Sequence, residues 1–317
     1  MSMDEATRRA LDAGREQADE VLEFRAKALR KRAAVFARQP LSLVADEVAA
    51  AAATPMPPVL AAAAASMGSL VAEGDSWFDY PWTDVLRMLE DEHGYDVDSV
   101  AHKGDRVEEM AYGGGQLEEF TRRIEKLLRK GRPPKAILLS GGGNDIAGSE
   151  FAMLLNHAAS AMPGLNEQVV AGVVDERIRL AYVYILSAVT RICEKWLQQP
   201  LPILVHGYDY PVPDGRGFMG GWGFLPGPWL EPGFREKGFT RLEDRKALMK
   251  RLIDRFNTML AQVAALQEFP HVRYVDLRNT LSSGADYKKF WDNELHPTPR
   301  GFGLVADRFV AALTKLT

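Results

Sequence analysis

From residue 67 onward, short apolar runs alternate with longer segments whose apolar residues recur at helical spacing. The short runs have the length and composition of β-strands, and the segments between them are typical of amphipathic helices. The expected strands are 69–74, 95–101, 135–141, 202–207 and 272–277, and the expected helices are 82–92, 105–130, 175–198, 241–267 and 299–314. This alternation predicts an α/β fold, a three-layer α/β/α sandwich around a five-stranded parallel sheet.

The first 66 residues follow a different, helical pattern. An apolar stripe with alternating spacings of four and three runs through residues 4–38 and consists of Leu22, Ala26, Leu29, Ala33 and Phe36. Pro40 ends this pattern, and a second helical stretch over 43–53 ends before the prolines of 54–58. We expect residues 1–66 to form a helical segment packed on a main domain at 67–317. The alternative is an arm that binds a partner, including a second copy of this chain.

Residues 207–234 break the alternation with a long run of glycines, prolines and aromatic residues directly after an expected strand. Loops of this length in compact domains are often binding loops or lids. Gly215, Gly217 and Gly220 spell the dinucleotide-binding pattern G-x-G-x-x-G. No strand immediately precedes them, and prolines and aromatic residues follow instead of a helix, so the pattern does not indicate a nucleotide site.

Composition and charge exclude several classes of function. The chain has 317 residues, 46% of them hydrophobic, and a net charge of −4, which gives no strong field for nucleic acid or an anionic membrane. The basic stretch 122–135 has helical spacing, and a solvated helix face is favoured over an anion site. Cys193 is the single cysteine, so the chain has no intramolecular disulfide and no cysteine metal cluster. The N-terminus lacks the apolar core of a secretory signal, and the alanine-rich run 59–70 is too short for a membrane span. We therefore expect a cytoplasmic protein without a membrane span.

Polar residues stand where the expected strands end. Ser76 follows the first strand in Gly74-Asp75-Ser76, Gly104 follows the second, and Asn144 follows the third in a glycine-rich turn. His296 precedes a proline just before the last expected helix. Because the carboxyl ends of parallel strands meet at one edge of a sheet, we expect these four residues to lie close together.

These residue types fit acyl transfer by a serine. A serine hydroxyl needs a base such as histidine within hydrogen-bonding reach, and the negative charge that develops on the substrate needs preorganised donors. The backbone N–H groups of Ser76 and Gly104 and the side-chain amide of Asn144 supply three candidate donors for an oxyanion hole. A glycine at 104 also lets the backbone approach a substrate closely.

At these positions the sequence resembles the SGNH hydrolases, also called GDSL esterases and lipases. Their motifs contribute a serine in GDS, a glycine, an asparagine in GxND and a histidine near DxxHP, which match Ser76, Gly104, Asn144 and His296. The resemblance covers roughly residues 67–317. It implies a flavodoxin-like α/β/α fold and ester hydrolysis through an acyl-enzyme, without a metal or an organic cofactor. The nucleophile-elbow pattern G-x-S-x-G of other hydrolases is absent from the sequence.

The sequence departs from DxxHP at the acid, since Asn293 stands three residues before His296 and Asp292 stands four before it. An asparagine carbonyl can accept the imidazole N–H, but it cannot stabilise an imidazolium by charge as a triad acid does. Three alternatives follow for the group that orients the imidazole: Asp292 after a local backbone shift, Asn293 as a neutral orienter, or a backbone carbonyl. We favour Asp292.

Other residues have a structural and a functional interpretation. Trp77, Trp222 and Trp229 are candidates for substrate binding, with packing as the alternative for Trp77, and the loop 207–234 is expected to form a wall or lid over the acyl group. Asp75 and Asp145 are expected to hydrogen-bond to loop backbone. Asp276 is a further carboxylate near the same sheet edge, and a loop cap is its favoured role.

The function that the sequence favours is therefore a serine esterase for short to medium acyl chains, acting on a small-molecule ester. A carbohydrate O-deacetylase that uses the same site is the close alternative. A non-catalytic binding protein that keeps the fold is the alternative from another class, because the expected acid is missing.

Overall fold

The computed structural model describes residues 3–36, 66–148, 150–220 and 225–316. Its centre is a five-stranded sheet in which all neighbouring strands are parallel, in the order β2-β1-β3-β6-β7. The strands are β1 (Ser69–Glu73), β2 (Asp96–Ser99), β3 (Ala136–Leu139), β6 (Ile203–His206) and β7 (Val272–Val275). All five lie within the ranges expected from the sequence.

Burial explains why the central strands have nearly uninterrupted apolar sequences. Every residue of β3 and of β6 is buried, and β1 is buried from its second residue onward, because helices cover both faces of the sheet. The edge strands β2 and β7 keep exposed positions. A run of apolar residues therefore marks the middle of this sheet, and a mixed run marks its edges.

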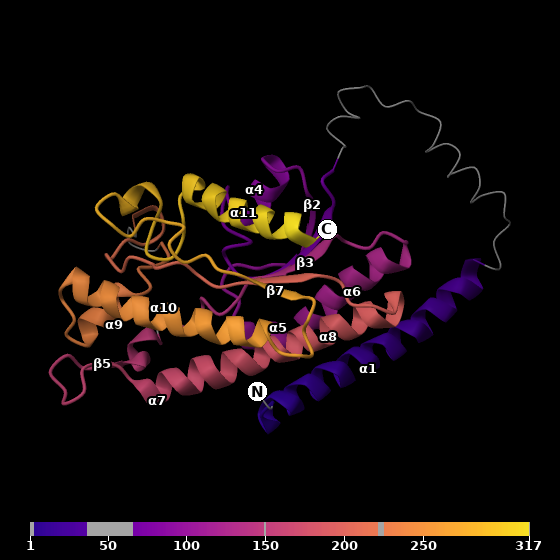
Figure 1. Ribbon diagram of the computed structural model, residues 1–317, viewed down its shortest axis with the longest axis horizontal. Coiled ribbons are helices and arrows are strands. Elements are labelled where there is room, and N and C mark those ends of the chain that lie inside the picture. Colours follow the sequence, from indigo (N-terminus) through magenta and orange to yellow (C-terminus); the bar gives the residue numbers. More distant parts are fainter. Residues whose placement is uncertain (1–2, 37–65, 149, 221–224, 317) are drawn as a thin grey trace.

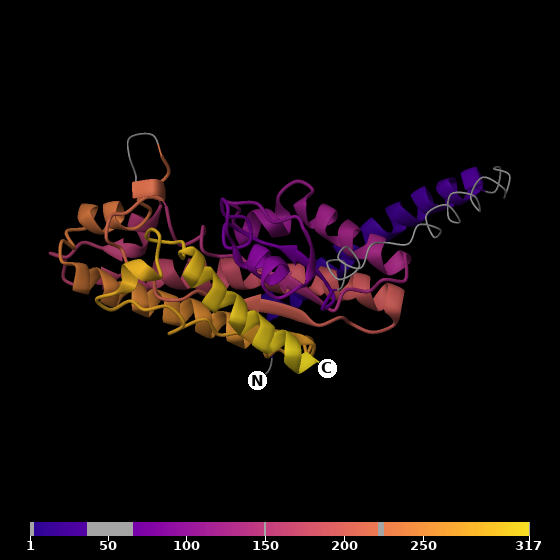
Figure 2. The same cartoon turned by 90° about the horizontal axis from the view of Figure 1, so that it is seen from above.

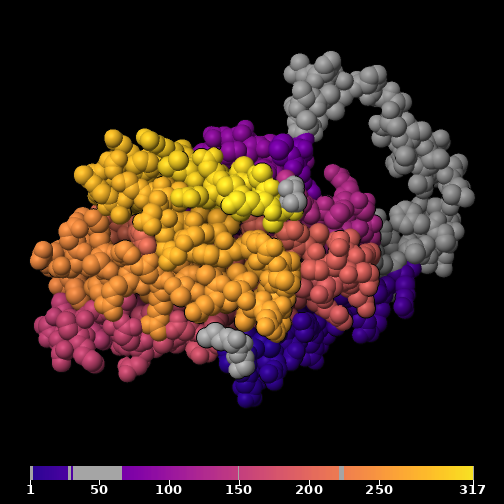
Figure 3. All heavy atoms as spheres, viewed as in Figure 1, coloured from indigo at the N-terminus to yellow at the C-terminus, as the bar shows by residue number. Residues whose placement is uncertain are grey.

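Two layers of helices enclose the sheet (Figures 1 and 2). Helices α4 (Val85–Asp91) and α11 (Pro299–Leu313) pack against each other on one face. The other face carries α5 (Val107–Tyr112), α6 (Gln116–Arg129), α8 (Arg179–Leu197) and α10 (Leu242–Ala264). The expected three-layer sandwich is thus confirmed. In the space-filling view of Figure 3, the C-terminal part of the chain forms most of the face shown.

Helix α1 (Glu5–Phe36) lies outside α8 and extends past it on one side (Figures 1 and 2). The two helices approach so closely that a Cβ atom on Gly14 would clash with the Tyr184 carbonyl oxygen. Asp19 pairs with Arg191 of α8 through two hydrogen bonds of 2.9 Å each. The first N-terminal helix is thus packed on the main domain, as expected. The second expected stretch, 43–53, lies outside the described residues, and the domain boundary and association through these helices stay predictions.

One expected helix is wrong, because 105–130 forms two helices. Three consecutive glycines, 113–115, separate α5 from α6, and Gly115 has a φ of +102°, which side chains other than glycine rarely adopt. The structure also contains short elements that the sequence pattern did not indicate. They include β4 (Leu155–Asn156), β5 (Gly164–Leu165), α7 (Glu167–Val170), a π-helical stretch (Ala171–Ile178) and α9 (Glu231–Glu236).

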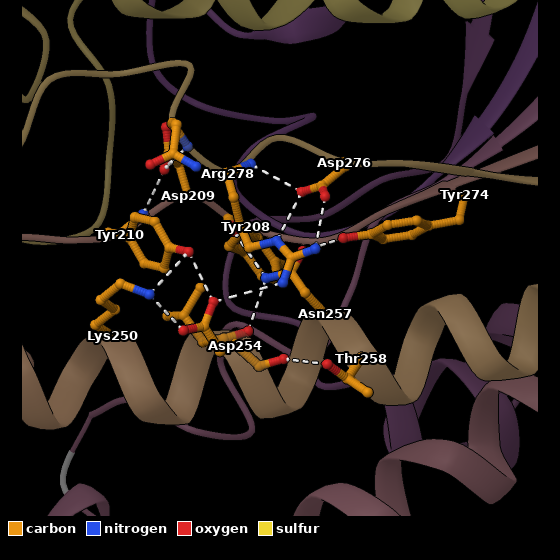
Figure 4. Close-up of polar contacts among 12 residues, drawn as sticks. Tyr208, Asp209, Tyr210, Lys250, Asp254, Asn257, Thr258, Tyr274, Asp276 and Arg278 are labelled. Atoms are coloured by element: carbon orange, nitrogen blue, oxygen red, sulfur yellow. Dashed lines mark hydrogen bonds and ion pairs between the residues drawn. The ribbon is translucent and has the colours of Figure 1, made fainter.

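A polar network ties the segments after β6 and β7 to α10 (Figure 4). The Tyr210 hydroxyl donates to Asp254 of α10 at 2.7 Å, and Arg278 pairs with both Asp254 and Asp276. The buried Asp209 carboxylate accepts the backbone N–H groups of residues 279, 280 and 281. These contacts fix where the loop 207–234 leaves the sheet. Asp276 also accepts the N–H of Arg278, as expected for a loop cap.

Within the described residues, no helix has both the length and the apolar character needed to cross a bilayer.

The end of β1 contains an unusual buried acid, Glu73, which is 1% exposed. One carboxyl oxygen accepts the N–H of Gly74 at 2.8 Å and the Gln116 amide at 3.2 Å, and the other has no hydrogen-bond partner. Burial raises the pKa of Glu73 from 4.5 to about 8, so the folded protein keeps this carboxyl protonated at neutral pH.

We predict that Glu73 makes the folded state less stable as the pH rises from 4.5 to about 8. Over that range the unfolded chain has released the proton that the folded chain still holds, which contributes a loss of up to about 1.4 kcal/mol per pH unit. Glu73→Gln mimics the protonated form and should remove this part of the slope. Urea unfolding at several pH values measures it.

The exposed Glu92→Gln serves as the control and should keep the wild-type pH dependence. Identical slopes for wild type and Glu73→Gln would show that Glu73 is ionised in the fold.

Candidate active site

Ser76 lies in a tight turn directly after β1, and Asp75 holds this turn in place. Asp75 is buried, and its Oδ1 accepts the N–H of Trp77 at 3.0 Å and the Ser140 hydroxyl at 2.9 Å. Its Oδ2 accepts the Tyr208 hydroxyl. The expectation that Asp75 hydrogen-bonds to loop backbone is confirmed. Because Asp75 fixes this turn, the half-buried Ser76 is held at the carboxyl end of β1.

The Ser76 hydroxyl meets the imidazole of His296, which the sequence places 220 residues away. The distance between Ser76 Oγ and His296 Nε2 is 2.7 Å. On the far side of the ring, Nδ1 lies 3.0 Å from Asn293 Oδ1. That oxygen also accepts the N–H groups of Leu295 and His296 itself, so it must be the carbonyl oxygen of the amide. Nδ1 therefore carries the proton, and Nε2 is free to accept from Ser76.

The expectation that the Asp292 carboxylate orients the imidazole is wrong, because Asn293 occupies that position. The backbone N–H of Asp292 pairs with the His296 carbonyl, which closes a turn that leaves the Asp292 side chain exposed. Asp292 Oδ2 instead accepts from the Tyr80 hydroxyl and from the Asn293 amide, each at 3.2 Å. Asp292 therefore contacts the group that holds His296, and does not reach the imidazole.

Aromatic rings surround His296. The Tyr80 ring stacks on the imidazole with centroids 4.2 Å apart and planes 19° apart, and Trp229 approaches it edge-on at 5.5 Å. Burial lowers the pKa of His296 from 6.5 to about 3, because no carboxylate faces the ring to favour its protonation. The imidazole is thus neutral at physiological pH and ready to accept a proton.

Gly104 and Asn144 line the same cleft as Ser76 and His296. Gly104 has a φ of +95°, and a Cβ atom there would meet nothing within 4 Å, so the backbone conformation is what requires glycine. The Asn144 amide donates to the carbonyl oxygen of Asp105 at 2.9 Å, which ties the loop after β3 to the loop after β2. A second amide N–H of Asn144 is left for a ligand. The three residues predicted from the strand ends and His296, predicted from its place before the last helix, are thus brought together.

Glu294 was missed by the sequence analysis, although it fixes the walls of this cleft. It is fully buried, and its two oxygens accept four backbone N–H groups at 2.7–3.0 Å, from Gly215, Trp229, Leu230 and Glu231. Burial raises the pKa of Glu294, and these four bonds oppose the rise. One carboxylate thus joins the His296 turn to two separate parts of the loop 207–234, which we call the aromatic loop: Gly215 and residues 229–231. The sequence signal that could have indicated Glu294 is its position, two residues before the candidate histidine His296.

The aromatic loop forms one wall of the cleft. Phe218, Leu225, Pro226 and Trp229 line it, opposite Tyr80. Trp77, by contrast, is 4% exposed, and its indole N–H donates to the Leu295 carbonyl at 3.1 Å, so it positions the His296 turn from the core. Trp222 lies outside the described residues. The glycine pattern at 215–220 lies in this loop and does not open a helix after a strand.

Asp145 and Asp276, two further acids near this edge of the sheet, do not contact His296. Asp145 accepts the N–H of Val107 at the start of α5, as expected, and burial raises its pKa to about 6. Asp276 pairs with Arg278, away from His296. Across residues 3–36, 66–148, 150–220 and 225–316, no three histidine, cysteine or acidic side chains converge in a way that could hold a metal ion.

Comparisons with known proteins agree with the resemblance seen in the sequence. Residues 68–304 match the model of the GDSL-like Lipase/Acylhydrolase family. No curated protein matches the sequence. Among solved structures, the chain is similar to the lipase Lip_vut3 from a goat rumen metagenome, with 15% identity over 77% of this chain and 96% of that chain and a TM-score of 0.48. It is also similar to a catalytic mutant of Axe2, an acetylxylan esterase from Geobacillus stearothermophilus, with 14% identity, 78% and 94% coverage and a TM-score of 0.42. A third similar structure is TesA, with 15% identity, 78% and 99% coverage and a TM-score of 0.41.

We predict that Glu294→Gln loosens the aromatic loop and destabilises the fold by about 3 kcal/mol, because the new amide group faces backbone N–H donors. Urea unfolding measures the stability. Limited trypsin digestion measures the loop, since Arg216 should be cleaved faster once its neighbour Gly215 is released. Exposed Glu236 on α9 gives the control Glu236→Gln, which should behave as wild type. Equal stability and equal cleavage in Glu294→Gln would contradict the role of this carboxylate.

Proposed function

The chain belongs to the GDSL-like lipase/acylhydrolase family, and from this premise we propose that Ser76 is the nucleophile and His296 the general base of a serine esterase. The family match confirms the resemblance drawn from the sequence and makes the chain an enzyme that hydrolyses esters. The observation that carries the assignment is the 2.7 Å hydrogen bond from Ser76 Oγ to His296 Nε2, with Nδ1 held by Asn293.

The reaction follows from this geometry. Ser76 Oγ attacks the ester carbonyl carbon while its proton passes to His296 Nε2. The bond to the alcohol oxygen then breaks, and that oxygen takes the proton from Nε2, which leaves an acyl group on Ser76. A water molecule repeats the same two steps, with His296 again as base and then acid, and releases the carboxylic acid.

The negative charge on the carbonyl oxygen needs donors in the cleft. Ser76 N–H, Gly104 N–H and the second amide N–H of Asn144 fill this role in the proposal. What supports it is that all three residues line one cleft and that Asn144 is already fixed through Asp105. Preorganised donors of this kind need no metal and no organic cofactor.

Asn293 replaces the usual acid as a neutral orienter. It holds the tautomer that the base requires, and Asp292 and the Tyr80 hydroxyl hold its amide in turn. The imidazolium that forms during the reaction lacks a carboxylate partner, but it faces the π-surface of Tyr80. A cation above an aromatic ring gains about 0.5–2 kcal/mol when water is excluded. Tyr80 thus supplies part of what a triad acid normally supplies.

We predict that Ser76→Ala abolishes hydrolysis of p-nitrophenyl esters, with a fall in kcat of roughly 10⁴-fold or more, because the nucleophile is lost. The measurement uses a panel from acetate to palmitate with both proteins side by side. Labelling by a fluorophosphonate should disappear in the same variant.

Ser160→Ala changes an exposed serine and should keep full activity and labelling. Equal hydrolysis by wild type and Ser76→Ala would remove Ser76 from the mechanism.

We predict that the acid limb of the kcat/KM profile lies well below pH 6.5, the ordinary pKa of histidine, because burial lowers the pKa of His296. The double variant Asp292→Asn with Asn293→Asp places an acid three residues before His296 and should move this limb to higher pH. Asn293→Ala should lower kcat/KM by roughly 10²-fold or more, because the imidazole loses its orienting contact. Profiles of pH against kcat/KM for p-nitrophenyl acetate measure these effects.

Asp292→Asn alone serves as the reference, since it keeps the contact between Asn293 and His296. If the acid limb of the kcat/KM profile lies at the same pH in the folded double variant as in the wild type, residue 293 does not orient His296.

A further inference from the structure

Two hollows meet at Ser76 and Asn144, the two residues that line both of them. The first is the cleft described above, with a volume of about 330 Å³. The second, which we call the small cavity, has a volume of about 40 Å³ and lies toward the core and α10. The proposed reaction needs two places beside Ser76, one for the acyl chain and one for the alcohol.

The position of His296 decides which hollow receives the alcohol. His296 lines the cleft and does not line the small cavity. The leaving alcohol oxygen takes its proton from Nε2, so that oxygen must lie within hydrogen-bonding reach of this atom. Gly104, a proposed oxyanion donor, also lines only the cleft. The alcohol and the oxyanion therefore both lie on the cleft side of Ser76.

The small cavity has the chemistry of an acyl site. Most of its lining side chains are apolar, among them Ile146, Leu230, Met249, Ile253 and Leu295. Two of its three acidic or phenolic groups pair with each other, since Asp75 accepts the Tyr208 hydroxyl, and Asp209 accepts loop N–H groups. The buried indole N–H of Trp291, which also lines the cavity, has no hydrogen-bond partner among the described residues. An alkyl chain that enters there breaks none of the hydrogen bonds made by Asp75, Tyr208 and Asp209.

The size of the small cavity limits the chain that fits. A water-sized group occupies about 10–15 Å³, so about 40 Å³ holds roughly three such groups. Met249 and Ile253 are each 2% exposed and Leu230 is fully buried, so the walls are packed from behind and do not open to solvent. A longer chain would need the core around α10 to repack, which is costly in a close-packed interior.

The cleft, by contrast, suits a bulky alcohol with a flat ring. The rings of Tyr80, Phe218 and Trp229 line it, and Trp82, 73% exposed and with a φ of +67°, stacks on Phe218 and continues the aromatic surface outward. Lys103 also lines the cleft; its backbone N–H donates to Asp79, and its side-chain amine forms no ion pair among the described residues. Its amine can donate to an oxygen-rich alcohol.

We propose that the small cavity is the acyl site and that it restricts the enzyme to esters of short acids, of two to about four carbons, with large ring-bearing alcohols in the cleft. This inference rests on the proposed function and deepens it. It favours, among the substrates considered, short acyl esters of cyclic alcohols such as sugars or phenols, and it makes Met249 a residue that determines acyl length.

Two substitutions of opposite effect test the acyl site. Met249→Ala enlarges the small cavity and should move the preferred acyl length of p-nitrophenyl esters up by about two to four carbons. Ala147→Leu fills the cavity from the other side and should lower kcat/KM for butyrate by roughly tenfold or more relative to acetate. A general loss of stability cannot shift the preferred length in both directions.

Met259→Ala is the matched control, because Met259 lies on the same helix, is equally buried and does not line the small cavity. It should leave the acyl preference unchanged. Octanoate as the best substrate of the wild type, or an unchanged preference in folded Met249→Ala, would overturn the acyl assignment while Ser76-dependent hydrolysis persists. Loss of all Ser76-dependent hydrolysis would instead overturn the proposed function.

The alcohol side is tested with acetates of different alcohols and the variant Phe218→Ala. Acetates of a methyl glycoside and of phenol should be cleaved with higher kcat/KM than hexyl acetate, and Phe218→Ala should reduce that advantage. The pair of ring alcohols separates a sugar from an aryl group as the preferred ring. Equal rates for all three acetates would overturn the cleft assignment.

Discussion

The buried carboxylate of Glu294 is the constraint on which the geometry of this site depends. A charge without a cationic partner is tolerated in a protein interior only when hydrogen bonds satisfy it, and here four backbone N–H groups do so. Those groups belong to Gly215 and to residues 229–231, two separate parts of the aromatic loop, whereas Glu294 itself lies two residues before His296. The His296 turn and the wall of the cleft therefore form one unit, and neither can shift without leaving the carboxylate or its donors unpaired.

Buried carboxylates that accept backbone N–H groups also hold the other loops at this edge of the sheet. Asp75 holds the Ser76 turn by accepting the Trp77 N–H, and Asp209 holds the loop after β7 through three N–H groups. Loops without regular hydrogen bonding are thereby held by buried carboxylates, and the Ser76–His296 contact is formed before any substrate binds. Preorganisation of this kind lowers the reorganisation that the reaction requires.

The sequence was sufficient for the sheet and for Ser76, Gly104 and Asn144 at the strand ends, because apolar runs mark buried strands and parallel strands bring their ends together. It was not sufficient where local backbone geometry decides. The glycines 113–115 split one expected helix, and the turn from Asp292 to His296 exposes Asp292 and buries Asn293. A one-residue difference in a turn changes which side chain faces the imidazole, and spacing alone does not determine it. The small cavity depends on packing between distant segments, which no local pattern reports.

The neutral environment of His296 explains how the site can work without a triad acid. In a dry pocket, a permanent carboxylate beside the imidazole would have to be buried, at a cost that only good pairing offsets. In the proposed mechanism the two charges arise together, the imidazolium next to the oxyanion, so the net charge of the site stays constant through the first step. In that mechanism the oxyanion meets the proposed N–H donors, and the imidazolium meets the Tyr80 ring at 4.2 Å and the Asn293 carbonyl oxygen at 3.0 Å. The Asn293 carbonyl dipole and the quadrupole of the Tyr80 ring thus replace the full charge of a triad carboxylate. As a result, His296 stays unprotonated at low pH, but it is also a weaker base.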